Sequence, residues 1–234
     1  MILETISLDE NTKIYKGKLG LFDKFNQKEY IDKIIYLKHL YPEYVSHPRT
    51  KFPGYQYTIF AQYDEIDFMY SEVRNWAKEN LNIHLECMIK SWVYMSDKSN
   101  VYSGYHAHPK TQYEDRGIIK EFDSTFVTTY YLQMPNNLEG DDGYIYFKTK
   151  DEKEFGFLPK EDEIIIFPAD LEHNVRLNKK STIPRICIAS NYMYFNYKDA
   201  KRFSYLYVEN KLCILKDKRR IKHWEKVKIE INNI

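Results

Sequence analysis

Residues 163–175, EIIIFPADLEHNV, run from a β-branched segment to a histidine, and the rest of the chain can be interpreted outward from them. Earlier in the chain stands His106-Ala107-His108-Pro109. Two histidines at i and i+2 project to the same face of an extended strand. A third histidine from a later strand, here His173, can complete three adjacent corners of an octahedral metal site and leave three corners open.

Arg185 follows the last of these histidines at strand distance. Its planar, permanently charged guanidinium binds carboxylates through two parallel hydrogen bonds. Strand alternation places Arg185, Cys187 and Ala189 on one face and Ile186 and Ile188 on the other. We therefore expect the arginine to point to the same interior as the small residues beside it, near the open metal corners, where it can bind the far carboxylate of an anionic co-substrate.

Two amphipathic helices are expected before the histidine region. Residues 27–41 repeat apolar side chains at steps of three and four, and residues 64–81 do the same. Residues 47–54, between them, contain two prolines and a glycine. This composition predicts an irregular loop, which is a candidate lid.

From residue 86 onward the pattern changes to short β-branched and aromatic runs that are separated by turn residues. Many short, closely spaced strands are typical of a sandwich or barrel, so the predicted class is mainly β (α+β), with the N-terminal helices packed on one outer face. The predicted strands are Cys87–Met95, Phe126–Met134, Tyr144–Lys148, Phe155–Leu158, Glu163–Phe167, His173–Leu177 and Arg185–Phe195.

These blocks resemble the Fe(II)/2-oxoglutarate-dependent oxygenases that are common in phages and marine bacteria. The resemblance covers residues 88–195 and rests on HxHP at 106–109, FPxxLxHxV at 167–175 and RIxIAxN at 185–191. It implies a double-stranded β-helix, or jelly-roll, core. The expected organisation is one oxygenase domain over residues 1–234, with a helical N-terminal part at 1–85, the jelly-roll core at 86–200 and a C-terminal extension at 201–234.

The resemblance also implies the chemistry: oxidative decarboxylation of 2-oxoglutarate to succinate, coupled through Fe(II) and O2 to hydroxylation of a substrate, with ascorbate as a candidate reductant. His173 corresponds to the distal iron ligand, Arg185 to the partner of the 2-oxoglutarate carboxylate, and His106 and His108 to the proximal ligand or ligands. The protein would supply binding and orientation, and the cofactor the chemistry.

Two departures from the family pattern stand in the same motifs. The commonest proximal motif is His-x-Asp, but this chain has His108 at the carboxylate position if His106 is the first ligand. If His108 is the first ligand, that position falls on Lys110, whose charged form does not bind iron. Cys187 stands where many relatives carry a serine that contacts the co-substrate.

Further candidates for binding the co-substrate lie on the predicted strands. Tyr130 and Tyr131 are neighbours, so one of them faces inward and can donate a hydrogen bond to the 2-oxoglutarate carboxylate. Asn191 faces the same side as Arg185 if the strand is regular.

Candidate substrate contacts are Trp92, on the strand before the HxHP motif, and Arg116, within the charged insertion at 112–123. The insertion is expected to form part of the mouth of the site. Substrate identity is left open between a small molecule and a peptidyl group, and no oligomeric state is predicted.

Two other functions fit the same residues. One is a three-histidine, cupin-type metalloenzyme that uses no keto acid. The other is a catalytically silent jelly-roll binding module. Arg185 favours the keto-acid oxygenase over the cupin-type enzyme, because only a co-substrate carboxylate requires it. Loss of iron binding by the purified protein would favour the binding module.

Composition narrows the partners and the location. The formal charge of +1 over 234 residues makes nucleic-acid binding unexpected. The three cysteines lack CxxC spacing, which is typical of a reducing compartment. No apolar run is long enough for a signal peptide or for the roughly 20 residues of a membrane span. We expect a cytoplasmic protein, and the family resemblance adds the expectation of a virus-encoded protein in the host cytoplasm.

Overall fold

The computed structural model describes residues 3–40, 55–57, 64–83, 85, 87–96, 104–115, 118–176 and 180–193. This part of the chain is mostly β, with two helices. The predicted loop at 47–54 and the extension at 201–234 lie outside it. The strands are β1 (Leu3–Ser7), β2 (Lys13–Lys18), β3 (Tyr55–Tyr57), β4 (Cys87–Ser96), β5 (Lys110–Asp115), β6 (Ile118–Asp123), β7 (Phe126–Gln133), β8 (Ile145–Lys148), β9 (Glu154–Phe157), β10 (Glu163–Pro168), β11 (Glu172–Val175) and β12 (Arg185–Met193), and the helices are α1 (Gln27–Leu40) and α2 (Asp64–Leu81).

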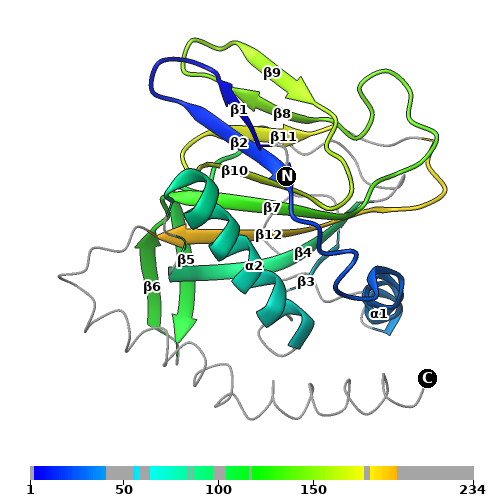
Figure 1. Ribbon diagram of the computed structural model, residues 1–234. Coiled ribbons are helices and arrows are strands. Elements are labelled where there is room, and N and C mark those ends of the chain that lie inside the picture. Colours follow the sequence, from blue (N-terminus) through cyan, green and yellow to red (C-terminus); the bar gives the residue numbers. More distant parts are fainter. Residues whose placement is uncertain are drawn as a thin grey trace.

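Two antiparallel sheets face each other across an apolar interior (Figure 1). The larger sheet has the strand order β1-β2-β10-β7-β12-β4-β3, and the smaller has the order β11-β8-β9. Strands that are distant in sequence pair directly, since β12 lies between β4 and β7. The result is a jelly-roll-like arrangement, and the predicted mainly β class is confirmed.

The N-terminal part is not purely helical, and the prediction for residues 1–85 is wrong in this respect. β1 and β2 form a hairpin, and β2 pairs with β10 to extend the larger sheet. Within β2 only Ile14 and Gly17 are fully buried. A strand that buries so little lacks the alternation of apolar side chains by which strands are recognised.

Both predicted helices are confirmed, and their ends have physical causes. α1 follows Asn26, whose side-chain oxygen accepts a hydrogen bond from the Glu29 N–H at 3.2 Å, as an N-cap residue does. Asn82 follows α2 with a φ of 55°, the left-handed conformation that commonly ends helices.

The two helices share one apolar cluster with the larger sheet, and Figure 1 shows α2 running alongside that sheet. The Gln27 side chain of α1 also donates a hydrogen bond to the Leu132 carbonyl of β7. The cluster consists of Leu19, Leu21, Tyr30, Ile31, Ile34, Met69, Val73, Trp76, Ala77, Leu85, Val93, Met95, Tyr130, Leu132, Ile164, Ile166, Ile186, Ile188 and Tyr192.

A second apolar cluster fills the space between the two sheets. Because side chains alternate along a strand, β7, β10 and β12 each contribute to both clusters. The interior cluster consists of Ile14, Val127, Tyr131, Ile145, Phe147, Ile165, Phe167, Ala169, Leu171 and Cys187. This alternation decides which side chains of each strand face the histidines described below.

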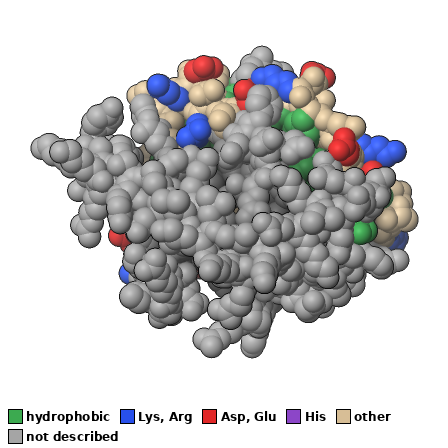
Figure 2. Space-filling view, turned by 90° about the horizontal axis from the view of Figure 1, so that it is seen from below, with side chains coloured by type: hydrophobic (Ala, Val, Ile, Leu, Met, Phe, Trp, Pro, Cys, Tyr) green, Lys and Arg blue, Asp and Glu red, His purple; other side chains and the backbone are tan. Residues whose placement is uncertain are grey.

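The insertion after the HxHP motif forms a separate two-stranded hairpin of β5 and β6. On the face seen in Figure 2, acidic and basic side chains of the described residues are intermixed along the rim. Neither described helix is long and apolar enough to cross a membrane.

Candidate functional site

Three histidines from distant parts of the sequence come together at one end of the interior. The potential ligand atoms of His106, His108 and His173 all lie within 4.8 Å of one another. The ring centroids are 4.4 Å apart for His106 and His173, and 5.1 Å apart for each of the other two pairs. The arrangement predicted from the spacing is therefore present as a geometric cluster.

Backbone hydrogen bonds hold the three residues in register. His106 and His173 form an antiparallel bridge in which each N–H donates to the other's carbonyl, at 3.1 and 2.9 Å. The His108 N–H donates to the Ala169 carbonyl at 2.7 Å. Side chains of a directly paired couple lie on the same face, and the i+2 residue returns to that face. The cluster thus follows from strand pairing.

Two of the imidazoles form a hydrogen bond to a backbone carbonyl through Nδ1. Nδ1 of His106 lies 3.2 Å from the Gly104 carbonyl, and Nδ1 of His173 lies 3.1 Å from the Leu171 carbonyl. A carbonyl only accepts, so each Nδ1 carries the proton and each Nε2 presents a lone pair. Metal-binding histidines in proteins are usually fixed in this way.

Burial favours the neutral form of His106 and His173. Desolvation lowers the pKa of His106, against a smaller opposing effect of the Gly104 carbonyl. Desolvation also lowers the pKa of His173 well below its usual range, and the neighbouring His106 and His108 add to this. Because metals bind the neutral imidazole, these two histidines have the protonation state that a metal ligand needs.

Aromatic side chains surround the histidines. The Trp92 ring on β4 lies 5.5 Å from His108, and the Phe167 and Phe147 rings lie 4.8 and 6.3 Å from His173. The structure therefore brings Trp92, a predicted substrate contact, against the cluster. Apolar surroundings strengthen the electrostatic interactions within such a site.

Arg185 is 1% exposed and lies at the start of β12. Its Nη2 donates to the Tyr131 hydroxyl at 3.0 Å. Its Nε and Nη1 atoms have no hydrogen-bond partner, and no carboxylate of the described residues forms an ion pair with it. A buried cation with unused donors is costly without an acceptor. Arg185 thus has the chemistry of an anion-binding residue, with Nε and Nη1 as its available donors.

The face of the sheet that carries Arg185 continues toward the histidines. Cys187 and Ala189 follow at alternate positions of β12, and Ala189 pairs with Thr129 of β7. These side chains are small. Arg185 is also close enough to contribute to the lowered pKa of His173. A small, elongated anion could therefore extend from the arginine toward the histidines along this face.

The other predicted co-substrate residues divide between the two faces of the larger sheet. Tyr131 faces the interior beside Arg185, whereas Tyr130 belongs to the helix-side cluster and donates its hydroxyl to Asp162 at 2.8 Å. The structure does not bring Tyr130 to the arginine. Asn191 is buried on the strand of Arg185, but a register shift follows it.

Arg116 lies outside the described residues. The sequence interpretation also missed two residues that contact the strands around the arginine. Tyr94 of β4 pairs with Cys187, two residues after Arg185 on β12. Its position two residues after Trp92 could have indicated that it faces the same way. Asp162 holds the backbone of Tyr131, and no local pattern marks it.

The donor set fits both groups that the sequence resemblance implies. Three imidazoles whose potential ligand atoms lie within 4.8 Å of one another suit Fe(II), for which nitrogen ligands are common. The two unused donors of Arg185 suit a carboxylate. Three histidines also suit other divalent ions, so the histidines alone do not decide between metals.

No family model matches the sequence, and no curated protein matches it. The structure, in contrast, is similar to several solved structures. A prolyl-4-hydroxylase from Pseudomonas putida has a TM-score of 0.53 and 12% identity, over 78% of this chain and 93% of that one. HygX from Streptomyces hygroscopicus, with nickel and 2-oxoglutarate bound, has a TM-score of 0.52 and 11% identity, over 80% and 85%.

SnoK, an alpha-ketoglutarate-dependent carbocyclase of nogalamycin biosynthesis, has a TM-score of 0.57 and 8% identity, over 77% of this chain and 79% of that one. At such low identity the likeness establishes the fold and not the activity. The chain has a jelly-roll-like fold of the kind found in Fe(II)/2-oxoglutarate oxygenases, and it carries a three-histidine cluster inside that fold.

Proposed function

We propose that the protein is an Fe(II)- and 2-oxoglutarate-dependent dioxygenase that hydroxylates a small-molecule or peptidyl substrate. One observation carries the proposal: Arg185 is buried with two unused donors on the interior face that leads to three clustered histidines. A metal cluster alone would suit many enzymes. The arginine adds the requirement for a carboxylate at a distance from the metal.

In this proposal His106 and His173 hold the iron through Nε2, and His108 holds it through one of its two ring nitrogens. Arg185 binds the far carboxylate of 2-oxoglutarate through Nε and Nη1. When bound, iron with 2-oxoglutarate and O2 supplies the oxidising chemistry that releases succinate and carbon dioxide and hydroxylates the substrate. The protein's own contribution is orientation and exclusion of water.

Tyr131 is the second proposed contact to the carboxylate. Its hydroxyl already accepts a hydrogen bond from Arg185, so its own proton can be donated to an oxygen of the co-substrate. Burial raises the pKa of Tyr131, which keeps this hydroxyl protonated. Trp92 is the proposed wall of the substrate site because its ring lies against His108.

The test is binding and turnover of 2-oxoglutarate by the Fe(II)-loaded protein with ascorbate, with succinate as the readout. Arg185→Ala should raise the Kd for 2-oxoglutarate roughly 10- to 100-fold, since a charge-assisted hydrogen bond contributes about 1.5–3 kcal/mol. Arg176→Ala is the matched control, because Arg176 is partly exposed and pairs with Asp141 near the surface. It should leave the Kd unchanged.

Equal affinity in wild type and Arg185→Ala would argue against a keto-acid enzyme. Metal binding without any effect of 2-oxoglutarate would support the three-histidine enzyme that uses no keto acid. A protein that binds no Fe(II) would support the binding module. Substrate class can then be sought with proline-containing peptides and small metabolites, with stimulated succinate release as the readout.

A further inference from the structure

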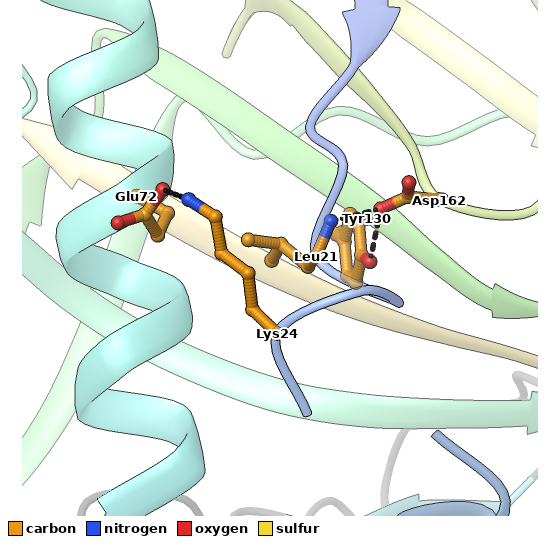
Figure 3. A network of polar contacts seen from close by, with 5 residues as sticks. All are labelled: Leu21, Lys24, Glu72, Tyr130 and Asp162. Atoms are coloured by element: carbon orange, nitrogen blue, oxygen red, sulfur yellow. Dashed lines mark hydrogen bonds and ion pairs between the residues drawn. The ribbon is translucent and has the colours of Figure 1, made fainter. Parts of the chain in front are cut away.

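Asp162 is a buried carboxylate on the helix side of the larger sheet, away from the histidines. It is 1% exposed. Its Oδ1 accepts hydrogen bonds from the Leu21 N–H at 2.9 Å and from the Tyr130 hydroxyl at 2.8 Å, as Figure 3 shows. Its Oδ2 has no hydrogen-bond partner and lies 3.8 Å from Nζ of Lys18, whose side chain is largely exposed.

The backbone of Asp162 makes two further bonds. Its N–H donates to the Tyr131 carbonyl at 2.9 Å, and its carbonyl accepts from the Leu19 N–H at 3.0 Å. Its φ of 63° lies in the left-handed region, which Asp and Asn adopt more readily than other side chains. One residue thus binds the segment at Leu19–Leu21 and the dipeptide Tyr130–Tyr131.

This dipeptide is where the two faces of β7 meet. Asp162 binds the Tyr130 hydroxyl on the helix side of the sheet through its side chain, and the backbone carbonyl of Tyr131 through its own N–H. The Tyr131 side chain points the opposite way and accepts the hydrogen bond of Arg185. Asp162 thus fixes the Tyr131 carbonyl and the side chain of its neighbour Tyr130. This leaves the Tyr131 side chain, and hence the Arg185 guanidinium bonded to it, little freedom of direction.

A buried carboxylate of which one oxygen has no hydrogen-bond partner is a costly way to join two segments, because burial disfavours its charged form. We propose that Asp162 is a positioning residue that holds the Tyr131–Arg185 pair in the orientation that binds a carboxylate. This inference rests on the proposed function, since the carboxylate in question is that of 2-oxoglutarate. Asp162 acts through Tyr130 and Tyr131 and touches no ligand itself.

Three variants separate positioning from simple stability. Asp162→Gly removes the carboxylate and tolerates the positive φ. Asp162→Asn retains an acceptor at Oδ1 and also tolerates that φ, so it should restore the wild-type behaviour. Tyr130→Phe removes one hydrogen bond without touching the backbone, and it keeps the test valid if the glycine variant fails to fold. Tyr30→Phe, another buried tyrosine of the same cluster, is the control.

Two measurements are needed. The first is the nitrogen-15 NMR signal of the Arg185 guanidinium in the metal-free protein, assigned by its loss in Arg185→Lys. It should be sharp and protected from exchange in wild type, Asp162→Asn and Tyr30→Phe, and broadened in Asp162→Gly and Tyr130→Phe. The second is the Kd for 2-oxoglutarate of the Ni(II)-loaded protein, which should rise about three- to tenfold in the latter two variants, as loss of one hydrogen bond predicts.

The two measurements test the positioning role and the proposed function separately. A normal Arg185 signal in folded Asp162→Gly and Tyr130→Phe, even with a lowered melting temperature, would overturn the positioning role. A wild-type protein that binds no 2-oxoglutarate would overturn the proposed function, while the NMR signal would still decide whether Asp162 orients the arginine. An Asp162→Asn protein that behaves like Asp162→Gly would also contradict the inference, because it retains the acceptor.

Discussion

At the scale of residues, the site depends on three clustered imidazoles, and burial lowers the pKa of two of them, His106 and His173. His106 and His173 donate Nδ1–H to backbone carbonyls, which leaves Nε2 toward the cluster. If His106 is the first ligand, His108 stands at the position that carries a carboxylate in the commonest motif of the oxygenases that the sequence resembles. A carboxylate would bring a negative charge to a divalent metal, whereas an imidazole brings none. Whether His108 itself binds the metal is therefore the first point to test.

The first prediction concerns these ligands. His173→Ala should abolish binding of one Fe(II) or Ni(II) per chain, measured by metal analysis after dialysis. His108→Asp should retain the ion, because it creates two histidines and one carboxylate. His108→Ala should lose most affinity if His108 is a ligand, but only roughly 10- to 100-fold if it merely supports one. Full metal content in His173→Ala, or a folded but metal-free His108→Asp, would contradict the assignment.

The second prediction concerns pH. Burial lowers the pKa of both His106 and His173, whereas a histidine in the unfolded chain has a pKa of about 6.5. Below that pH the unfolded state binds more protons than the folded state, so the free energy of unfolding falls as pH drops. The loss begins near pH 6.5 and continues down to the folded pKa values.

We expect the urea midpoint of the metal-free protein to fall between pH 7.5 and pH 5.5. The double variant His106→Gln/His173→Gln should lose less stability over the same interval, because it lacks the two buried imidazoles. A wild-type midpoint that changes no more than that of the double variant would show that neither histidine is held neutral by the fold.

At the scale of elements, the smaller sheet carries His173 and depends on β8. In this sheet β11 pairs with β8, and His173 is the partner of Phe147. Phe147 is fully buried and its ring packs on Phe167, which in turn lies against His173. The smaller sheet is short, so a few such side chains supply most of its packing. β8 therefore links the stability of the fold to the geometry of the cluster.

The third prediction follows from this link. Phe147→Ala should lower the free energy of unfolding by about 3–5 kcal/mol, as large-to-small changes of buried aromatic residues do, and should weaken metal binding. Phe155→Ala is the control, because Phe155 of β9 is the strand partner of Phe147 but is 39% exposed. Its cost should remain near or below 1 kcal/mol by urea unfolding. Equal costs for both changes would contradict the proposed role of β8.

At the scale of the whole molecule, the larger sheet separates two apolar clusters. One faces the helices and the other faces the smaller sheet. The same strands β7, β10 and β12 supply alternate side chains to both. A change on the helix side can therefore act on the interior through the strand that both faces share, as proposed for Asp162.

The fourth prediction concerns ligands and global stability. Ni(II) at a hundredfold excess over its Kd should stabilise the protein by about 2.7 kcal/mol, and 2-oxoglutarate should add to this only when the metal is present. For a chain of this size such a gain raises the melting temperature by about 5–10 °C. His173→Ala should show neither shift. An increase with 2-oxoglutarate alone, in the presence of a chelator, would contradict the metal-dependent site.

Much of the architecture was predictable because it depends on local pattern. The helices α1 and α2 follow from apolar residues at steps of three and four, and most interior strands from runs of β-branched and aromatic residues. The strands β1 and β2 were missed because β1 is mostly exposed and only Ile14 and Gly17 of β2 are fully buried. Their place in the sheet comes from backbone pairing with β10, which leaves little trace in side-chain identity.

The candidate site divides in the same way. By itself, the sequence determined the three histidines and Arg185, because i and i+2 spacing and strand alternation are local properties. Only the tertiary structure decided that Tyr131 and not Tyr130 lies beside the arginine, that Arg185 has no carboxylate partner among the described residues, and that Asp162 holds the dipeptide from the other side. The reason is register: which face of a strand is buried against which neighbour depends on pairing between segments that are far apart in the chain.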